Sequence, residues 1–198
     1  MTELSFHEDD YCQIELLPAE SESFCLSEVK AIAAFSERHG APEGIGWTDI
    51  YVRKENSIPL SRLGILLSGL RTTLSSIAPE ADAVYTGYSR ARMKCKQTVA
   101  FGTSNELVLF ADFDAAGTVE HIWLVLDVRT ETQIQTALNM FRVLAEKVSL
   151  ILVDWGWCFV SKLNEPSALD TYLRQRVEVF SKTVPPQNVW PWWQQWKR

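Results

Sequence analysis

Carboxylates near the ends of expected strands are the residues whose types could do chemistry. Asp112 and Asp114, with Glu120 and Asp127 beyond them, form a loose carboxylate set that could serve a nuclease. Their spacing is not specific, because acids are also common in turns and at strand ends for structural reasons. A small enzyme acting on a nucleotide or nucleic acid therefore stays open as an alternative function.

The histidines and cysteines form no recognisable nucleophile pair or metal site. His39 falls at an expected helix end, where its charge complements the helix dipole. Cys95 lies between Lys94 and Lys96, and cationic neighbours of this kind lower a thiol pKa. We nevertheless expect small, mostly buried thiols in a reducing compartment, because no C-x-x-C pair occurs among Cys12, Cys25, Cys95 and Cys158. The sequence thus predicts no catalytic residue, metal or cofactor.

Negative charge is concentrated at the start of the chain. The formal net charge is −6, and residues 1–29 contain no lysine or arginine. The acids of this segment are Glu3, Glu8, Asp9, Asp10, Glu15, Glu20, Glu22 and Glu28. Tyr11, Ile14 and Leu16 supply enough apolar content for a strand, so the carboxylates would stand on an ordered scaffold. Such a surface steers a basic partner and disfavours nucleic acid, although a simple solvated face stays open.

A short basic row is the counterpart of this segment. Within residues 88–97 the cations alternate with small apolar residues, and they are Arg90, Arg92, Lys94 and Lys96. In a strand all four would lie on one face. They could contact phosphate or nucleic acid, but we favour a structural role, either as a charged edge strand or as an internal partner for the acidic segment.

The pattern of expected elements favours an α+β fold with a largely antiparallel or mixed sheet and about four helices packed on it. Apolar residues recur at helical spacing over 28–39, 65–77, 131–148 and 166–180. Strands are expected over 11–17, 44–53, 83–88, 90–101, 107–112, 119–128, 150–153 and 155–160. These elements occur in runs and not in strict alternation, and turn residues at 102–105 and 114–117 favour local hairpins.

We expect one domain over 1–184, followed by a Trp/Pro-rich segment over 185–198 that holds four of the eight tryptophans. That segment either packs on the domain or docks a partner, so an adaptor or chaperone is a further alternative function. The chain has no apolar run near the roughly 20 residues that span a bilayer, and its start does not resemble a secretory signal. We therefore expect a cytoplasmic protein without a membrane contact.

Two short motifs carry a family resemblance. The sequences HEDDYCQIELLP over 7–18 and GWTDIYVR over 46–53 resemble cognate immunity proteins of interbacterial toxin pairs, such as type VI secretion effectors, and TGYS over 86–89 is a weaker echo. The resemblance implies a protein that binds one toxin domain tightly and occludes its active site. We hypothesise that the toxin is contacted by Glu8, Asp9, Asp10 and Glu15, with Trp47 and Asp49 as an aromatic and acidic adjunct.

Overall fold

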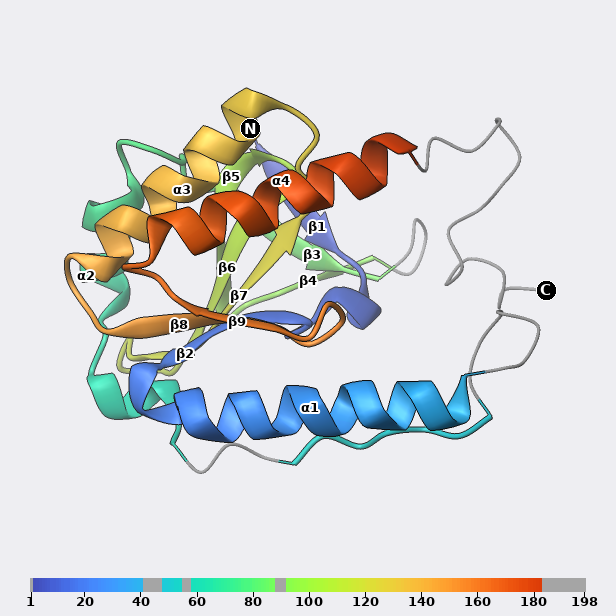
Figure 1. The fold of residues 1–198 in the computed structure, drawn as a ribbon. Coiled ribbons are helices and arrows are strands. Elements are labelled where there is room, and N and C mark those ends of the chain that lie inside the picture. The colour runs from blue at the N-terminus through green and yellow to red at the C-terminus, as the bar shows by residue number, and fades with distance from the viewer. Residues whose placement is uncertain (1, 41–47, 55–57, 88–91, 183–198) are drawn as a thin grey trace.

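A six-stranded antiparallel sheet forms the centre of the molecule (Figure 1). The computed structural model describes residues 2–40, 48–54, 58–87 and 92–182. In spatial order the strands are β5 (Thr98–Ser104), β6 (Leu107–Phe113), β7 (Val119–Leu126), β2 (Ile14–Pro18), β8 (Leu150–Asp154) and β9 (Phe159–Lys162). The β5–β6–β7 meander follows from the turn residues between these strands, whereas β2 is inserted between β7 and β8 from the start of the chain.

Helices cover both faces of this sheet. On one face, α3 and α4 pack with α2 on the largest apolar cluster, which includes Leu16, Leu124 and Leu152 (Figure 1). On the other face, α1 packs against Leu17, Ile151 and other residues that alternate with the first set. The helices are α1 (Glu22–His39), α2 (Leu67–Leu74), α3 (Glu131–Ala145) and α4 (Pro166–Lys182), and the 3-10 turns are η1 (Glu8–Asp10), η2 (Ala19–Ser21) and η3 (Leu60–Leu63).

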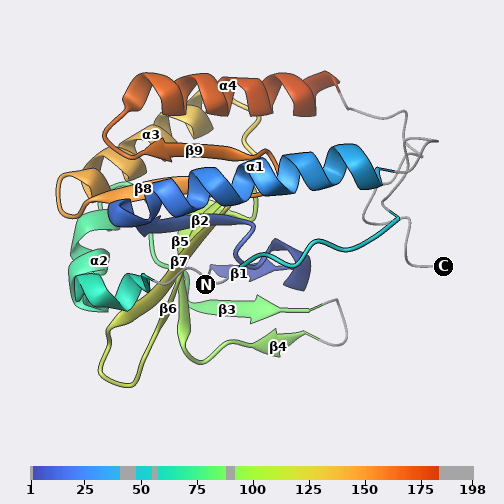
Figure 2. The ribbon, with the colours of Figure 1, turned by 60° about the horizontal axis from the view of Figure 1, so that its bottom comes forward.

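A second, three-stranded sheet lies beside α1 on the same face (Figure 2). Its central strand β3 (Ala83–Thr86) pairs parallel with β1 (Glu3–Phe6) and antiparallel with β4 (Met93–Lys94). It packs on the meander through a cluster in which Phe110 stacks on Trp123 at 4.1 Å between ring centroids. The large sheet is therefore sandwiched, as expected for strands whose residues are apolar on both faces.

The predicted α+β fold is confirmed, with four helices and mixed strand pairing. Some local predictions were wrong. The helix expected from residue 28 begins at Glu22, the strand expected over 90–101 is divided into β4 and β5, and 48–53 forms no strand in the described part of 44–53. The segment 155–158 is a turn before β9. The Trp/Pro-rich segment 185–198 lies outside the described residues, so its packing and the domain limit at 184 stay predictions.

Candidate functional site

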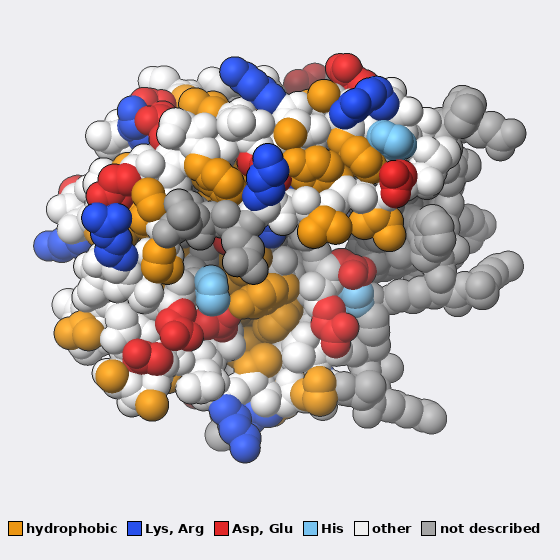
Figure 3. Space-filling view, turned by 90° about the horizontal axis from the view of Figure 1, so that it is seen from below, with side chains coloured by type: hydrophobic (Ala, Val, Ile, Leu, Met, Phe, Trp, Pro, Cys, Tyr) orange, Lys and Arg blue, Asp and Glu red, His pale blue; other side chains and the backbone are white. Residues whose placement is uncertain are grey.

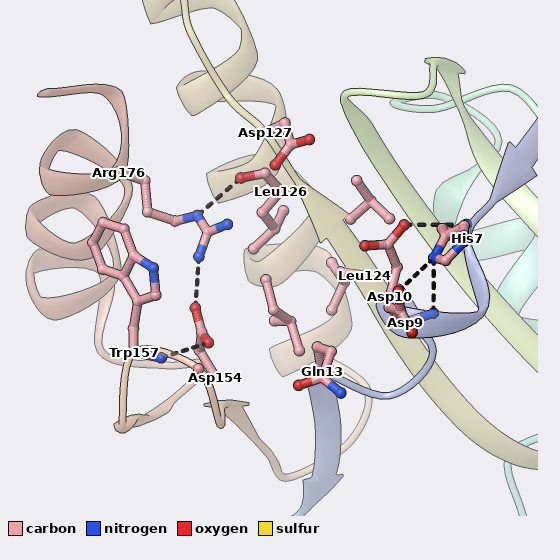
Figure 4. Close-up of a pocket in the computed structure, with 13 residues that line it drawn as sticks. His7, Asp9, Asp10, Gln13, Leu124, Leu126, Asp127, Asp154, Trp157 and Arg176 are labelled. Atoms are coloured by element: carbon pink, nitrogen blue, oxygen red, sulfur yellow. Dashed lines mark hydrogen bonds and ion pairs between the residues drawn. The ribbon is translucent and has the colours of Figure 1, made fainter. Parts of the chain in front are cut away.

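A cleft of about 540 Å³ opens at one edge of the large sheet (Figure 4). Its lining combines an apolar floor with charged walls. The lining residues are His7, Asp9, Asp10, Gln13, Ile14, Leu124, Val125, Leu126, Asp127, Asp154, Gly156, Trp157 and Arg176. We call this site the acidic cleft, since four of these residues are carboxylic acids and one is an arginine.

The acidic cleft exists because two neighbouring strands separate. β2 pairs with β7 only through Glu15–Trp123 and Leu16–Ile122. Beyond that point β7 continues to Leu126 with β6 as its partner, while Ile14 stays paired with Asp154 of β8. The sheet is therefore open between β2 and β7 where β2 begins and β7 ends, and side chains from both strands line the opening.

Two aspartates of η1 form one wall of the acidic cleft. The Asp10 carboxylate accepts a hydrogen bond from the His7 amide at 3.1 Å, and His7 Nδ1 accepts one from the Asp9 amide at 3.1 Å, which together cap the 3-10 turn. The Asp9 side chain is 70% exposed, whereas burial raises the pKa of Asp10 above its ordinary value. The turn thus holds a partly desolvated carboxyl group at the opening.

Asp127 follows β7 and adds a third acid to the acidic cleft (Figure 4). Burial raises its pKa, the positive charge of Arg176 lowers it, and the negative charge of Asp10 raises it further. Among the described residues no group donates a hydrogen bond to the Asp127 carboxylate. Arg176 and Arg129 favour the charged form of this desolvated acid, and a further cation bound in the acidic cleft would stabilise it more.

A buried ion-pair network forms the opposite wall. Arg176 Nη1 lies 2.6 Å from Asp154 Oδ2, and Arg176 Nε donates to the Leu126 carbonyl at 2.9 Å. The Tyr172 hydroxyl donates to the same Asp154 oxygen at 2.6 Å, and the Trp157 amide donates to the other at 3.0 Å. Because Asp154 is satisfied within the network, it is a scaffold group of the wall.

The predicted contact residues have different surroundings. Asp9 and Asp10 line the acidic cleft, Glu8 is exposed on the same turn, and Asp49 is exposed with one carboxylate oxygen accepting from the Ile50 amide. Glu15 is only 13% exposed, and its carboxylate accepts from Trp155 Nε1 at 2.6 Å and from Arg53 Nη1 at 2.9 Å. Trp47 lies outside the described residues.

Several acids of the N-terminal segment have ion-pair or hydrogen-bond partners within the chain. Glu3 pairs with Arg92 at 3.4 Å, and Glu22 pairs with Lys162 at 3.1 Å. The buried carboxylate of Glu28 accepts from the Tyr51 hydroxyl and the Lys54 amide, both at 2.9 Å. The negative surface is therefore smaller than the sequence suggests, and its unneutralised acids centre on η1.

The Glu3–Arg92 contact also bears on the basic row. The Arg92 guanidinium lies over the Tyr85 ring at 4.0 Å, and β4 is an outer strand of the small sheet. This agrees with the structural role that we favoured for the row. Arg90 lies outside the described residues.

The strand-end carboxylates do not converge on one site. Asp112 accepts from the Thr98 hydroxyl at 2.6 Å and from the Tyr11 hydroxyl at 3.0 Å, while Asp114 closes the β6–β7 turn by accepting from two backbone amides. Asp127 lies at the opposite end of β7. Within the described part of the chain, no three His, Cys, Asp or Glu side chains are placed to hold a metal ion.

Sequence reasoning missed Asp154, Trp157 and Arg176 as members of the site. An arginine at position 176 on the apolar-striped α4 was the available signal, because a charged residue on a covered helix face requires a partner. No described helix combines the length and apolar content that crossing a bilayer requires. Comparison with family models, curated proteins and solved structures found no match.

Proposed function

We propose that the protein is a cognate immunity protein, which binds a bacterial toxin in the cytoplasm and occludes its active site through the surface around η1. The acidic cleft is the observation that supports this most strongly. It presents Asp9, Asp10 and Asp127 above an apolar floor. A toxin that acts on nucleic acid has a cationic active site, and carboxylates imitate the phosphate that such a site binds.

The shape of the acidic cleft suits one cationic side chain of the toxin. An arginine or lysine has an apolar stem and a charged head, so its stem would pack on the partly exposed Val125 and Trp157 while the head meets the acids. The raised pKa values of Asp10 and Asp127 mean that both carboxylates are poorly solvated in the free protein. A bound cation would stabilise their charged forms, which favours association.

A binding role is also consistent with how the other acids are used. Glu15 and Glu28 are satisfied by internal donors and hold neighbouring segments in place. They therefore contribute the scaffold of the binding surface, whereas Glu8 and Asp9 project from it. The enzyme alternative lacks a comparable cluster in the described residues, since Asp112 and Asp114 have separate structural partners and Asp127 lies at the opposite end of β7.

Co-expression with the product of the adjacent gene tests the proposal. We expect the wild-type chain to rescue growth of cells that express that product and to copurify with it. A variant with Asp9→Asn and Asp127→Asn should rescue poorly, whereas a matched variant with Glu120→Gln and Glu146→Gln should behave as wild type. Equal rescue by both variants would assign binding to another surface, and no rescue by the wild-type chain would refute the immunity function.

A further inference from the structure

The segment 48–54 runs extended along α1, and both ribbon views place the two side by side (Figures 1 and 2). Contacts with the C-terminal part of α1 fix it there. The Thr48 amide donates to the His39 carbonyl at 2.8 Å, and the Tyr51 ring lies 5.3 Å from Phe35 in an edge-to-face arrangement. This segment is therefore an ordered extended chain without a strand neighbour among the described residues.

Alternate side chains of the segment are anchored on buried acids. The Tyr51 hydroxyl and the Lys54 amide donate to Glu28, which is 3% exposed. The Arg53 guanidinium pairs with Glu15 and lies 4.5 Å over the Trp155 ring. These contacts fix which edge and which side chains of the segment face outward.

The side chains between the anchors point away from the protein. Ile50 is 83% exposed and Val52 is 81% exposed, the two highest values among the large hydrophobic residues that the structure describes. Within the described residues the amides of Tyr51, Val52 and Arg53 donate no hydrogen bond, and the carbonyls over 49–53 accept none. An extended backbone with unpaired groups and exposed β-branched side chains is a template for strand addition.

We propose that segment 48–54 is a strand-addition site that pairs with an extended edge of the toxin. This inference rests on the proposed function and assigns it a second contact. Main-chain hydrogen bonds would form along Tyr51–Arg53, and apolar side chains of the toxin would cover Ile50 and Val52.

The segment is continuous with the acidic cleft. Arg53 Nη2 donates to the Cys12 carbonyl at 3.4 Å, and the Trp155 amide donates to the carbonyl of Gln13, which lines the acidic cleft. Figure 3 shows the face on which α1 and this segment lie, where hydrophobic side chains are interspersed with acidic ones. A single partner can therefore contact both features.

Charge favours a basic partner over a second copy of the chain. The segment carries Asp49, Arg53 and Lys54 and so has no negative excess of its own. The η1 turn beside its Arg53 anchor carries three acids, and two copies paired here would bring both η1 turns toward one interface, where like charges are unfavourable. A toxin edge with basic residues beside its apolar ones would complement the same surface. We therefore infer that segment 48–54 pairs with a strand of the same basic toxin that binds the acidic cleft.

Hydrogen–deuterium exchange on the complex with the adjacent gene product tests this inference. We expect the amides of Tyr51 and Arg53, which share the outward edge of the segment, to exchange rapidly in the free protein and to become protected in the complex. A variant with Ile50→Ser and Val52→Ser should bind about tenfold more weakly. The control variant, with Leu26→Ser and Met93→Ser, removes two other exposed hydrophobic side chains and should bind as wild type.

Each outcome has a distinct meaning. A complex in which the amides of Tyr51 and Arg53 exchange as rapidly as in the free protein would overturn the strand-addition site and leave the immunity function intact. Protection that increases with the concentration of the protein alone would assign the segment to self-association. Absence of any complex with the wild-type chain would overturn the proposed function and the toxin contact together.

Discussion

Arg176 and Asp154 form a buried ion pair, with 2.6 Å between Nη1 and Oδ2, and their side chains are 7% and 3% exposed. The pair connects α4 to the end of β8, and the Tyr172 hydroxyl shares the same carboxylate oxygen. The ring of Trp157 lies 5.0 Å from the guanidinium, so the turn after β8 is held against the helix as well. This connection gives the acidic cleft a rigid wall.

Removing one member of this pair should strongly destabilise the protein. Asp154→Asn leaves the guanidinium buried without its counter-charge, and we expect a loss of about 3–5 kcal/mol in the free energy of unfolding. Arg142→Met, which removes an exposed i,i+4 pair with Glu146, should cost less than about 1 kcal/mol. Urea unfolding measures both, and equal losses would show that the buried pair has no special role.

Glu15 should act as a positioning residue for segment 48–54. Glu15→Gln removes the charge that holds Arg53 while keeping an acceptor for Trp155 Nε1. We expect a loss of about 1–3 kcal/mol in stability and faster exchange of the Lys54 amide. Exchange at Lys54 that matches the wild type would show that Arg53 does not anchor the segment.

The acidic cleft should make stability depend on pH in a particular direction. Burial raises the pKa of Asp127, so the folded state binds more protons than the unfolded state between the unfolded pKa and the raised one. The contribution of this group to stability therefore falls as the pH rises through that window. Asp127→Asn removes this effect, so its stability relative to wild type should increase as the pH rises above about 4.

Urea unfolding of the wild type and Asp127→Asn at several pH values measures this difference. Glu120→Gln is the control, because Glu120 is exposed on β7. If the difference in unfolding free energy between wild type and Asp127→Asn does not change with pH, the pKa of Asp127 is not raised in the folded protein. Weaker toxin binding by the more stable variant would show that the desolvated charge serves binding at the expense of stability.

The four thiols should all have raised pKa values but should differ in how easily a reagent reaches them. Burial raises the pKa of Cys12 and of Cys25 to about 12, and burial also raises the pKa of Cys95 and Cys158. We expect Cys12 and Cys25 to resist a thiol reagent at about pH 8 until the protein unfolds, because the thiolate is the reactive form. Mass spectrometry after brief labelling identifies the modified residues, and rapid native labelling of Cys25 would refute the prediction.

The sequence predicted the elements whose signal is local. Helix α3 begins at residue 131 as expected, and the Thr130 hydroxyl caps it by accepting from the Gln133 amide, while α1 ends at residue 39 as expected and Gly40 follows it. The predicted start of α1 was wrong because Ser27 is of a residue type that often caps the start of a helix, although here it lies inside the helix. Local patterns specify helix interiors and turns better than the point at which a helix begins.

The strand expected over 44–53 from its β-favouring residues was wrong for the described part of that range. Tyr51 and Arg53 are half-buried while Ile50 and Val52 are exposed. Alternation reports which side chains are covered, whereas a strand also requires a neighbouring backbone. The acidic cleft could not be predicted for a related reason, because the separation of β2 from β7 depends on tertiary pairing.

The association rate of the protein with its toxin tests the central claim most directly. A variant with Glu8→Lys and Asp9→Lys is compared with one carrying Glu120→Lys and Glu146→Lys, which has the same net charge but leaves η1 unchanged. We predict that the first variant associates about tenfold or more slowly than wild type at low salt, and that this difference shrinks as salt is added. Equal association rates for the two variants would contradict binding through the acidic surface at η1.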